Sequence, residues 1–273
     1  MNIKSILLLL VYVFTALGSE KIVSLSPSIT EILYGLDTGD MIVATSSYSL
    51  YPKAAQNLPV VGGYTDPNIE KILTHRPTLV IGETFNTKTL QRLEHFHIKT
   101  LMLQLKTIKD IKHAISLLGQ TLNKTQKANK LITNITDAIK NIHKNSKAHS
   151  VLIVYGLHED LRSRIYVAGE NIFFNDIIKL SGNTNAYHNS LISQPVLSYE
   201  NIIALNPEQI IILHSHATEP NVDAKKALHN WYLLPTKAAK NKRISIVDED
   251  YLHIPSQRVA LSIKRLAKEM QDD

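Results

Sequence analysis

The chain repeats one short motif, EKILTHRPTLVI at residues 70–81 and ENIIALNPEQIII at residues 200–212. In both copies a glutamate, Glu70 or Glu200, is followed seven residues later by a proline and then by an apolar run. Proline interrupts helices, and a short apolar run after such a break is typical of a buried strand. We therefore expect a short helix, a proline break and a strand in each half of the chain. Two similar α/β lobes would place a ligand cleft between them.

Short apolar runs alternate with helix-forming segments on both sides of this motif. In the first half the runs lie at residues 21–25, 41–44 and 99–103, and in the second half at residues 151–155 and 244–247. Strands that alternate with helices at this spacing are typical of parallel βα units. The predicted fold class is therefore α/β, with a mainly parallel central sheet in each of two lobes.

A long helical segment separates the two halves. Residues 123–145 contain neither Gly nor Pro, and their apolar residues recur with the 3.6-residue period of an amphipathic helix. We interpret this segment as a rigid spine that joins an N-terminal lobe, residues 19–122, to a C-terminal lobe, residues 146–273. The alternative is an ordinary surface helix of a single domain.

Residues 1–18 have the pattern of a secretory signal peptide. Lys4 precedes an apolar run at residues 6–14, and a segment with small residues at both ends leads to the expected cleavage site between Gly18 and Ser19. An uncleaved membrane anchor is the alternative. The chain has no Cys, so it offers neither a lipid-anchoring cysteine nor a disulfide. We expect a periplasmic protein.

Composition argues against several function classes. The 273 residues are 44% hydrophobic and 20% charged, as in an ordinary globular protein. The formal net charge is +6, but the basic residues are scattered among acidic ones, so we expect no nucleic-acid partner. Without Cys, thiolate catalysis and Cys-ligated metals are excluded. The motifs of serine hydrolases, zinc proteases, P-loop enzymes and dinucleotide-binding enzymes are absent, so we do not expect an enzyme.

Histidines follow three predicted strands of the second half. His214 and His216 come directly after the strand of the second motif, and His158 and His253 follow two other strands. Because the carboxyl ends of parallel strands face the ligand crevice, we expect these side chains at one edge of the sheet. Neutral imidazole is a ligand for Zn, Cu, Fe, Ni and haem iron. His214, His216 and His253 are therefore a candidate metal set, unless they are solvated loop residues.

Tyrosine is the second residue type that indicates a binding site. Tyr48 and Tyr64 follow strand-like segments of the first half, and Tyr166 and Tyr251 do so in the second half. A tyrosine ring offers a flat apolar face and a hydroxyl, which suits a large planar or polar ligand, and its phenolate can bind ferric iron. The alternative is packing at the edge of the core.

The glutamates of the repeated motif have two possible roles. A carboxylate at the start of a helix is stabilised by the positive end of the helix dipole, which is a local structural role. Since Glu70 and Glu200 occupy the same position in the two copies, we also expect two exposed carboxylates, one per lobe, that dock onto paired cations of a partner.

Taken together, these segments resemble the class III (cluster A) periplasmic solute-binding proteins of ABC importers, over residues 20–270. The most specific segments are KIVSLSPSITEIL at residues 21–33, SSYSLYP at residues 46–52, and the two copies of the motif. The family carries cobalamin, iron–siderophore complexes and haem. The resemblance implies that Glu70 and Glu200 dock to arginines of the transmembrane permease, and that a single spine helix limits the hinge motion.

The pocket predicted from this resemblance differs from that of the cobalamin binders. Where those proteins have tryptophans, this chain has Tyr64, Glu83-Thr84 and Gln194, whereas Tyr48 and Tyr166 occupy positions of aromatic pocket residues. The added histidines favour a metal chelate or haem. The predicted ligand-binding residues are Tyr48, Tyr64, Glu83, His158, Tyr166, His214, His216, Tyr251 and His253.

The leading hypothesis is a monomeric binding protein that delivers a metal-containing ligand to an inner-membrane permease. The ligand would be an iron complex, haem, cobalamin or another metal chelate, and no intrinsic cofactor is expected. One alternative is a protein that binds bare Ni or Zn ions. A less favoured alternative is a periplasmic metalloenzyme in which Glu159 or Asp160 acts as general base.

Overall fold

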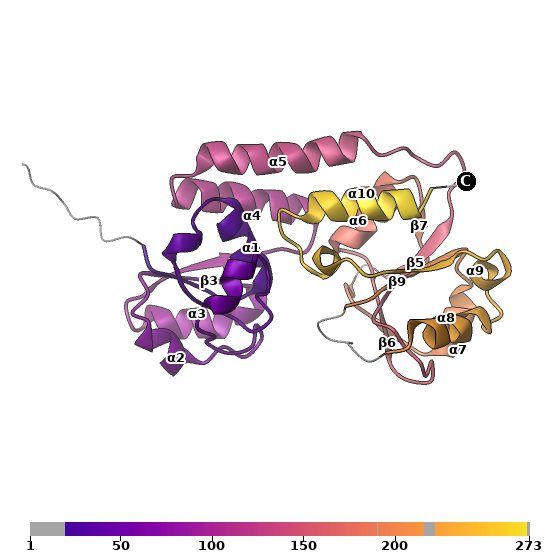
Figure 1. The fold of residues 1–273 in the computed structure, drawn as a ribbon, viewed down its shortest axis with the longest axis horizontal. Coiled ribbons are helices and arrows are strands. Elements are labelled where there is room, and N and C mark those ends of the chain that lie inside the picture. Colours follow the sequence, from indigo (N-terminus) through magenta and orange to yellow (C-terminus); the bar gives the residue numbers. More distant parts are fainter. Residues whose placement is uncertain (1–19, 190, 216–221, 272–273) are drawn as a thin grey trace, which may run out of the picture.

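The computed structural model describes residues 20–189, 191–215 and 222–271, so the predicted signal peptide lies outside the described part of the chain. These residues form two lobes beneath a layer of helices (Figure 1). The N-terminal lobe contains β1 (Ile22–Ser24), α1 (Pro27–Gly35), η1 (Gly39–Met41), β2 (Ile42–Thr45), η2 (Lys53–Asn57), α2 (Ile69–Thr74), β3 (Leu79–Glu83), η3 (Thr84–Asn86), α3 (Thr87–Glu94), β4 (Lys99–Leu103) and α4 (Ile108–Thr121).

A longer helix, α5 (Thr125–Lys140), leads to the second lobe. The C-terminal lobe contains β5 (Ser150–Tyr155), β6 (Ile165–Val167), α6 (Phe173–Leu180), β7 (Thr184–Asn185), β8 (Val196–Leu197), α7 (Tyr199–Leu205), β9 (Gln209–Leu213), α8 (Ala224–Tyr232), α9 (Lys237–Lys240), β10 (Ile244–Val247), η4 (Asp250–His253) and α10 (Val259–Glu269). No helix within the described ranges combines the length and the apolar character needed to cross a membrane.

The N-terminal sheet has the strand order β2-β1-β3-β4, and all neighbouring strands are parallel. Ile22 and Ile81 pack into one buried cluster, whereas Val23 and Val80 pack into another. Parallel strands that are buried on both faces need continuous apolar runs, and the sequence supplies them. All four strands therefore direct their carboxyl ends to the same edge of the sheet.

The C-terminal sheet has the order β10-β9-β5-β6-β8, and β7 pairs with β5. Strands β10, β9, β5 and β7 are parallel to one another. Strand β6 pairs with β5 and with β8, and both of these pairs are antiparallel. Every residue of β9 is buried. The predicted α/β fold class, with a mainly parallel sheet in each of two lobes, is confirmed.

Both copies of the repeated motif fold in the same way. Asn68 and Ser198 cap α2 and α7, since each side chain accepts a hydrogen bond from the backbone N–H three residues later, at 2.9 and 3.3 Å. The residue before each proline, Arg76 (φ 46°) or Asn206 (φ 48°), has a left-handed conformation. The residue before a proline is disfavoured in the right-handed helical region, so the helix stops there and β3 or β9 follows.

The predicted spine helix is shorter than the expected 123–145, because α5 covers Thr125–Lys140. At 1.5 Å per residue, its length is about 24 Å. After α5 the chain continues to the C-terminal lobe, where Asn145 forms two hydrogen bonds. The backbone N–H of Asn145 donates to the carbonyl of Ser181 at 3.1 Å, and its side-chain amide donates to the carbonyl of Met270 at 2.7 Å.

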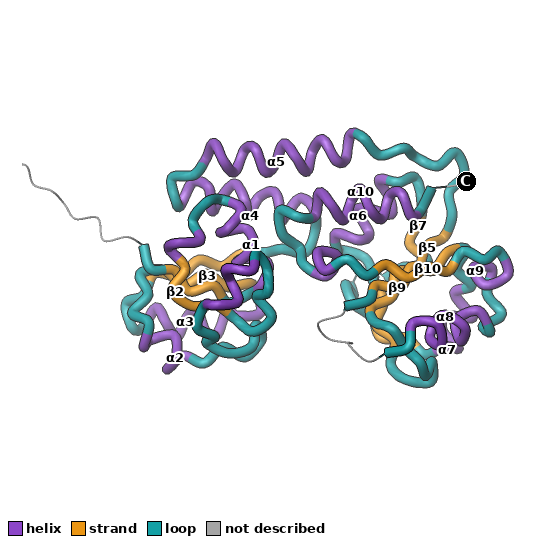
Figure 2. The backbone as a smooth tube through the Cα atoms, viewed as in Figure 1, coloured by secondary structure: helices purple, strands orange, loops and turns teal. Residues whose placement is uncertain are grey.

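The two lobes are joined by a layer of helices and not by α5 alone. Helix α5 packs on α4 and on α10 (Figures 1 and 2). A Cβ atom at Gly119 of α4 would lie 2.4 Å from the Cβ of Ala128 in α5, so this close contact requires a glycine. Ile115, Ile135 and Ile263, from α4, α5 and α10, share one buried apolar cluster that extends into both sheets. This continuous core fixes the relative orientation of the lobes.

Candidate functional site

A cavity of about 950 Å³ lies between the two lobes. Its wall includes the carboxyl ends of both sheets, since Glu83 ends β3, Tyr155 ends β5 and Asp248 follows β10. In α/β folds, ligands bind outside the carboxyl ends of the parallel strands. Cavities of several hundred to about 1,000 Å³ enclose most of the surface of a small-molecule ligand. Position and size therefore identify this cavity as the main candidate site.

Aromatic rings line the cavity from both sides. The N-terminal lobe contributes Tyr48, Tyr51, Tyr64 and Phe85, and the C-terminal lobe contributes Tyr155, Phe173 and Phe174. Each lobe forms one edge-to-face pair, Tyr64 with Phe85 at 5.4 Å between ring centroids and Tyr155 with Phe174 at 5.7 Å. Edge-to-face packing favours a defined ring orientation. The exposed rings of the N-terminal lobe thus offer apolar surface to a large ligand with a planar or apolar part, whereas Phe173 and Phe174 are only 3% and 1% exposed.

Four of the predicted ligand residues line this cavity, namely Tyr48, Tyr64, Glu83 and His253. Tyr48 is 63% exposed and has φ 63°, a left-handed conformation that is uncommon for a residue with a bulky side chain. Such conformations occur preferentially at ligand sites. The exposed ring of Tyr48 is therefore presented to the cavity at some conformational cost.

The other described candidates lie outside the cavity wall. His158 is held beside β5, because its Nε2 atom lies 3.1 Å from the carbonyl oxygen of Tyr155. Tyr166 lies in the antiparallel strand β6, where it pairs with Tyr155 at the carboxyl end of β5, but it is not part of the cavity wall. His214 is only 6% exposed. The ring centroid of Tyr251 lies 5.9 Å from Cζ of Arg258, and neither His214 nor Tyr251 is part of the cavity wall.

The candidate metal set is only partly described. His216 lies outside the described residues, so the set of His214, His216 and His253 stays a prediction. The Nε2 atom of His253 lies 3.1 Å from the backbone carbonyl oxygen of His214. Within the described ranges, no group of three or more His, Cys, Asp or Glu residues could hold a metal ion.

Glu83 is a half-buried carboxylate at the end of β3. Burial raises the pKa of Glu83, and a hydrogen bond with the Ser26 side chain opposes this effect. The backbone N–H of Glu83 donates to Oδ1 of Asn86 at 2.9 Å, which fixes the turn that carries the side chain. A carboxyl group with a raised pKa retains its proton more readily and can then donate a hydrogen bond to a ligand.

We expect the Glu83→Gln variant to be more stable than the wild type at pH 7. Because burial raises the pKa of Glu83, the folded state binds this proton more tightly than the unfolded chain does, and wild-type stability falls as pH rises above the ordinary glutamate value. Glutamine does not titrate, so its advantage should grow from pH 4 to pH 7 in thermal denaturation. Glu70→Gln, at an exposed site of the same lobe, is the control. Parallel Tm curves for wild type and Glu83→Gln would contradict this prediction.

One ion pair across the cleft was not predicted from the sequence. Arg258 donates to Glu31 from Nε at 2.9 Å and from Nη2 at 2.5 Å, and the two side chains are 10% and 3% exposed. Ser256 also donates to Glu31 at 2.5 Å, and the guanidinium lies 3.8 Å above the ring of Tyr51. Burial raises the pKa of Glu31, and Arg258 counteracts this effect. The sequence signal that could have indicated this ion pair is the acidic residue Glu31 inside the mainly apolar segment from Ile29 to Leu33.

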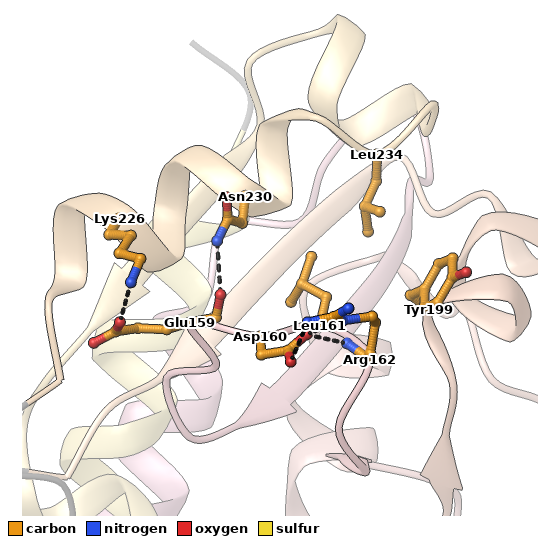
Figure 3. A pocket seen from close by; sticks show the side chains of 8 residues that line it. All are labelled: Glu159, Asp160, Leu161, Arg162, Tyr199, Lys226, Asn230 and Leu234. Carbon is orange, nitrogen blue, oxygen red and sulfur yellow. Dashed lines mark hydrogen bonds and ion pairs between the residues drawn. The ribbon is translucent and has the colours of Figure 1, made fainter.

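A second, open hollow of about 600 Å³ lies on the C-terminal lobe (Figure 3). Glu159 bonds to Lys226 at 2.8 Å, and Asp160 bonds to Arg162 at 2.9 Å. These hydrogen bonds lower the pKa of both carboxyl groups. A general base works best with a pKa near the working pH, so this arrangement does not favour the metalloenzyme alternative.

The glutamates of the repeated motif lie exposed in the first turns of α2 and α7. Both helices lie on the side of the molecule away from α5, one in each lobe (Figure 1). Glu70 and Glu200 thus occupy equivalent places at two separate tips, as expected for paired docking residues. The docking role itself stays a prediction.

The sequence profile of a family described as periplasmic binding protein matches residues 22–251. The chain belongs to this periplasmic binding protein family. The vitamin B12-binding protein of Vibrio vulnificus (strain CMCP6) is 29% identical over 273 residues, which cover 98% of this chain and 96% of that relative. The family and these relatives are substrate-binding proteins for transport and not enzymes, which agrees with the sequence-based expectation.

Solved structures of binding proteins share the fold. The periplasmic haem-binding protein HutB of Vibrio cholerae has a TM-score of 0.77 and 26% identity, with 93% of this chain and 100% of that chain covered. The periplasmic vitamin B12-binding protein BtuF of Vibrio cholerae has a TM-score of 0.72 and 25% identity, with 92% and 96% covered. The present chain is thus the substrate-binding component of an ABC importer, and the resemblance noted in its sequence is confirmed.

Proposed function

We propose that this binding protein captures a metal-containing tetrapyrrole, of the corrinoid or haem kind, in the cavity between its lobes. The observation that carries this proposal is the cavity of about 950 Å³ with aromatic rings from both lobes. The relatives, a vitamin B12-binding protein and a haem-binding protein, support the same ligand class. In this proposal the metal belongs to the transported ligand, and the protein has no cofactor of its own.

Delivery of the ligand completes the proposal. Glu70 and Glu200 would dock a monomeric binding protein onto cations of the permease, because both are exposed at equivalent tips of the two lobes. The signal peptide would direct export and be cleaved near Gly18 and Ser19. Binding of bare Ni or Zn ions is the alternative, and His216 of its predicted ligand set lies outside the described residues.

Ligand-free protein should be stabilised by cobalamin or haemin in a thermal-shift assay. A ligand that binds only the folded state adds about 2.7 kcal/mol at a hundredfold excess over Kd, which corresponds to a Tm increase of about 5–10 °C. Ferric siderophores and Ni or Zn with free histidine complete the panel. If no compound of the panel raised the Tm of protein shown to be ligand-free, the proposed function would be overturned.

The cavity should be distinguishable from other exposed aromatic sites by a matched pair of variants. Tyr64 and Tyr166 are both 46% exposed, but only Tyr64 lines the cavity. We expect Tyr64→Ala to weaken binding of the stabilising ligand by roughly tenfold, since it removes a ring from the wall. Tyr166→Ala should leave Kd unchanged in a fluorescence titration. Equal losses in both variants would place the ligand elsewhere.

A further inference from the structure

A cluster of buried hydroxyl groups lies behind the cavity wall of the N-terminal lobe. It brings together the last residues of β1 and β2, the first turn of α1 with its cap, and the loop that follows β2. Each member is at most 5% exposed, and the members are Ser24, Ser26, Thr30, Thr45, Ser46 and Ser49. None of these six residues is part of the wall, but Tyr48 and Leu50 from the same loop are.

The contacts of this cluster converge on Thr30. Its Oγ1 atom lies 2.7 Å from Oγ1 of Thr45, 2.8 Å from Oγ of Ser24 and 3.3 Å from Oγ of Ser49. Thr45 also donates to Oγ of Ser49 at 2.8 Å, and Oγ of Ser46 lies 3.3 Å from the same oxygen. A buried hydroxyl that loses its partner is costly, and linked hydroxyls strengthen one another. The cluster therefore favours one fixed arrangement of the segments that carry it.

Ser49 attaches the loop after β2 to this cluster. Its hydroxyl contacts Thr45 and Thr30, whereas the side chains of its neighbours Tyr48 and Leu50 are 63% and 47% exposed and line the cavity. The backbone N–H of Leu50 donates to the carbonyl of Tyr48 at 2.9 Å, so the turn around Ser49 is tight. The directions of the two wall side chains therefore depend on the anchored serine.

Tyr48 needs such an anchor because its backbone conformation is unfavourable. A positive φ, here 63°, is uncommon for a residue with a bulky side chain and persists only where neighbouring contacts hold it. On one side of Tyr48, the backbone N–H of Ser47 donates to the carbonyl of Gly62 at 2.9 Å. On the other side, Thr45 holds the hydroxyl of Ser49. The loop is thus fixed on both sides of the residue that presents its ring to the cavity.

We propose that Thr30, Thr45 and Ser49 are positioning residues for the ligand. Through Ser49 they hold the ring of Tyr48 in its cavity-facing conformation, and they raise ligand affinity without touching the ligand. This inference rests on the proposed function, since it concerns the wall of the same cavity. A wall side chain that is already ordered loses less conformational entropy when the ligand binds, so a preorganised wall binds more tightly. A cluster that served stability alone would leave ligand affinity unaffected.

A matched set of variants tests the inference with cyanocobalamin and haemin as ligands. Thr45→Val keeps the shape of the side chain and removes its hydroxyl, so we expect it to weaken binding by roughly tenfold in a fluorescence titration. Thr45→Ser keeps the hydroxyl and should bind like the wild type. Thr38→Val is the control, because Thr38 is also buried and donates to the carbonyl of Leu33 at 2.8 Å, outside the cluster. This control should lower Tm but leave Kd unchanged.

A double-variant cycle shows whether the cluster acts through Tyr48. In a Tyr48→Ala background the ring is absent, so Thr45→Val should change Kd by less than about twofold. If Thr45→Val weakened binding equally in both backgrounds, or left the affinity of otherwise wild-type protein unchanged, the inference would be overturned and the proposed function would stand. If the wild type bound neither ligand, both would be overturned.

Hydrogen exchange provides a readout that needs no ligand. Amide protons of residues 46–51 should exchange faster in Thr45→Val than in the wild type, because the loop that holds the N–H groups of Ser47 and Leu50 in hydrogen bonds loses its anchor. Thr38→Val should change exchange in this segment much less. Equal exchange in the wild type and Thr45→Val would overturn the inference, since the loop would then be held without the cluster.

Discussion

Replacement of Glu31 by glutamine should lower the free energy of unfolding by about 3 kcal/mol. The change leaves the guanidinium of Arg258 buried without its main partner, and the side chain of Arg258 is only 10% exposed. Removing one member of a buried ion pair costs much more than the pair itself contributes, because the other charge stays desolvated. Urea denaturation at pH 7 measures the loss.

The matched control is the outer partner of the same arginine. Asp250 also bonds to Arg258, but its side chain is 71% exposed. Exposed ion pairs contribute about 0–1 kcal/mol, so Asp250→Asn should have a small effect. The double variant Glu31→Gln with Arg258→Met should recover part of the stability lost by Glu31→Gln alone, because no buried charge is left uncompensated and Asp250 is exposed to solvent. If Glu31→Gln and Asp250→Asn lowered the free energy of unfolding by the same amount, burial of the carboxylate would not determine how much stability is lost.

Removal of both motif glutamates should abolish delivery without affecting capture. We expect the Glu70→Ala and Glu200→Ala double variant to reduce ligand uptake by at least tenfold in cells or in permease-containing vesicles. Interfacial charges at two separate tips steer and orient a partner together, so loss of both should exceed the effect of either single change. The Kd of the isolated protein should stay unchanged, since both residues are exposed outside the cavity.

Asp137→Ala is the control for the loss of a surface carboxylate. Asp137 is exposed on α5, on the side of the molecule opposite to α2 and α7. Uptake with this variant should equal that of the wild type. Normal uptake by the double glutamate variant would refute the docking proposal, and a parallel loss of ligand affinity would show that the tips act through the cleft.

Much of the fold was predictable because its signals are local. The repeated glutamate, proline and apolar run produce the same helix, left-handed residue and strand in both lobes, as Arg76 and Asn206 show. The spine was predicted too long because periodicity continues to Ile142. Helix α5 ends at Lys140, and Asn145 then bonds to distant residues of the C-terminal lobe, partners about which sequence periodicity contains no information.

The site was only partly predictable. Tyr48, Tyr64, Glu83 and His253 were proposed for the cleft and line the cavity, whereas Tyr51, Phe85 and Phe173 were missed. The missed residues lie in loops or at helix starts, where sequence periodicity gives no side-chain direction. Tyr166 was also proposed for the cleft, and it pairs with Tyr155 at the carboxyl end of β5 without being part of the cavity wall, so its role as a ligand residue stays a prediction.

The sequence by itself determined the two-lobed α/β architecture and the equivalent positions of Glu70 and Glu200, because helix caps, proline breaks and buried strands depend on neighbouring residues. Only the tertiary structure decided the charge and shape of the cavity. Glu31 and Arg258 are 227 residues apart in the chain, and their contact exists only because one apolar core brings the two lobes together. Such a contact depends on packing between distant segments, which no local pattern of residues encodes.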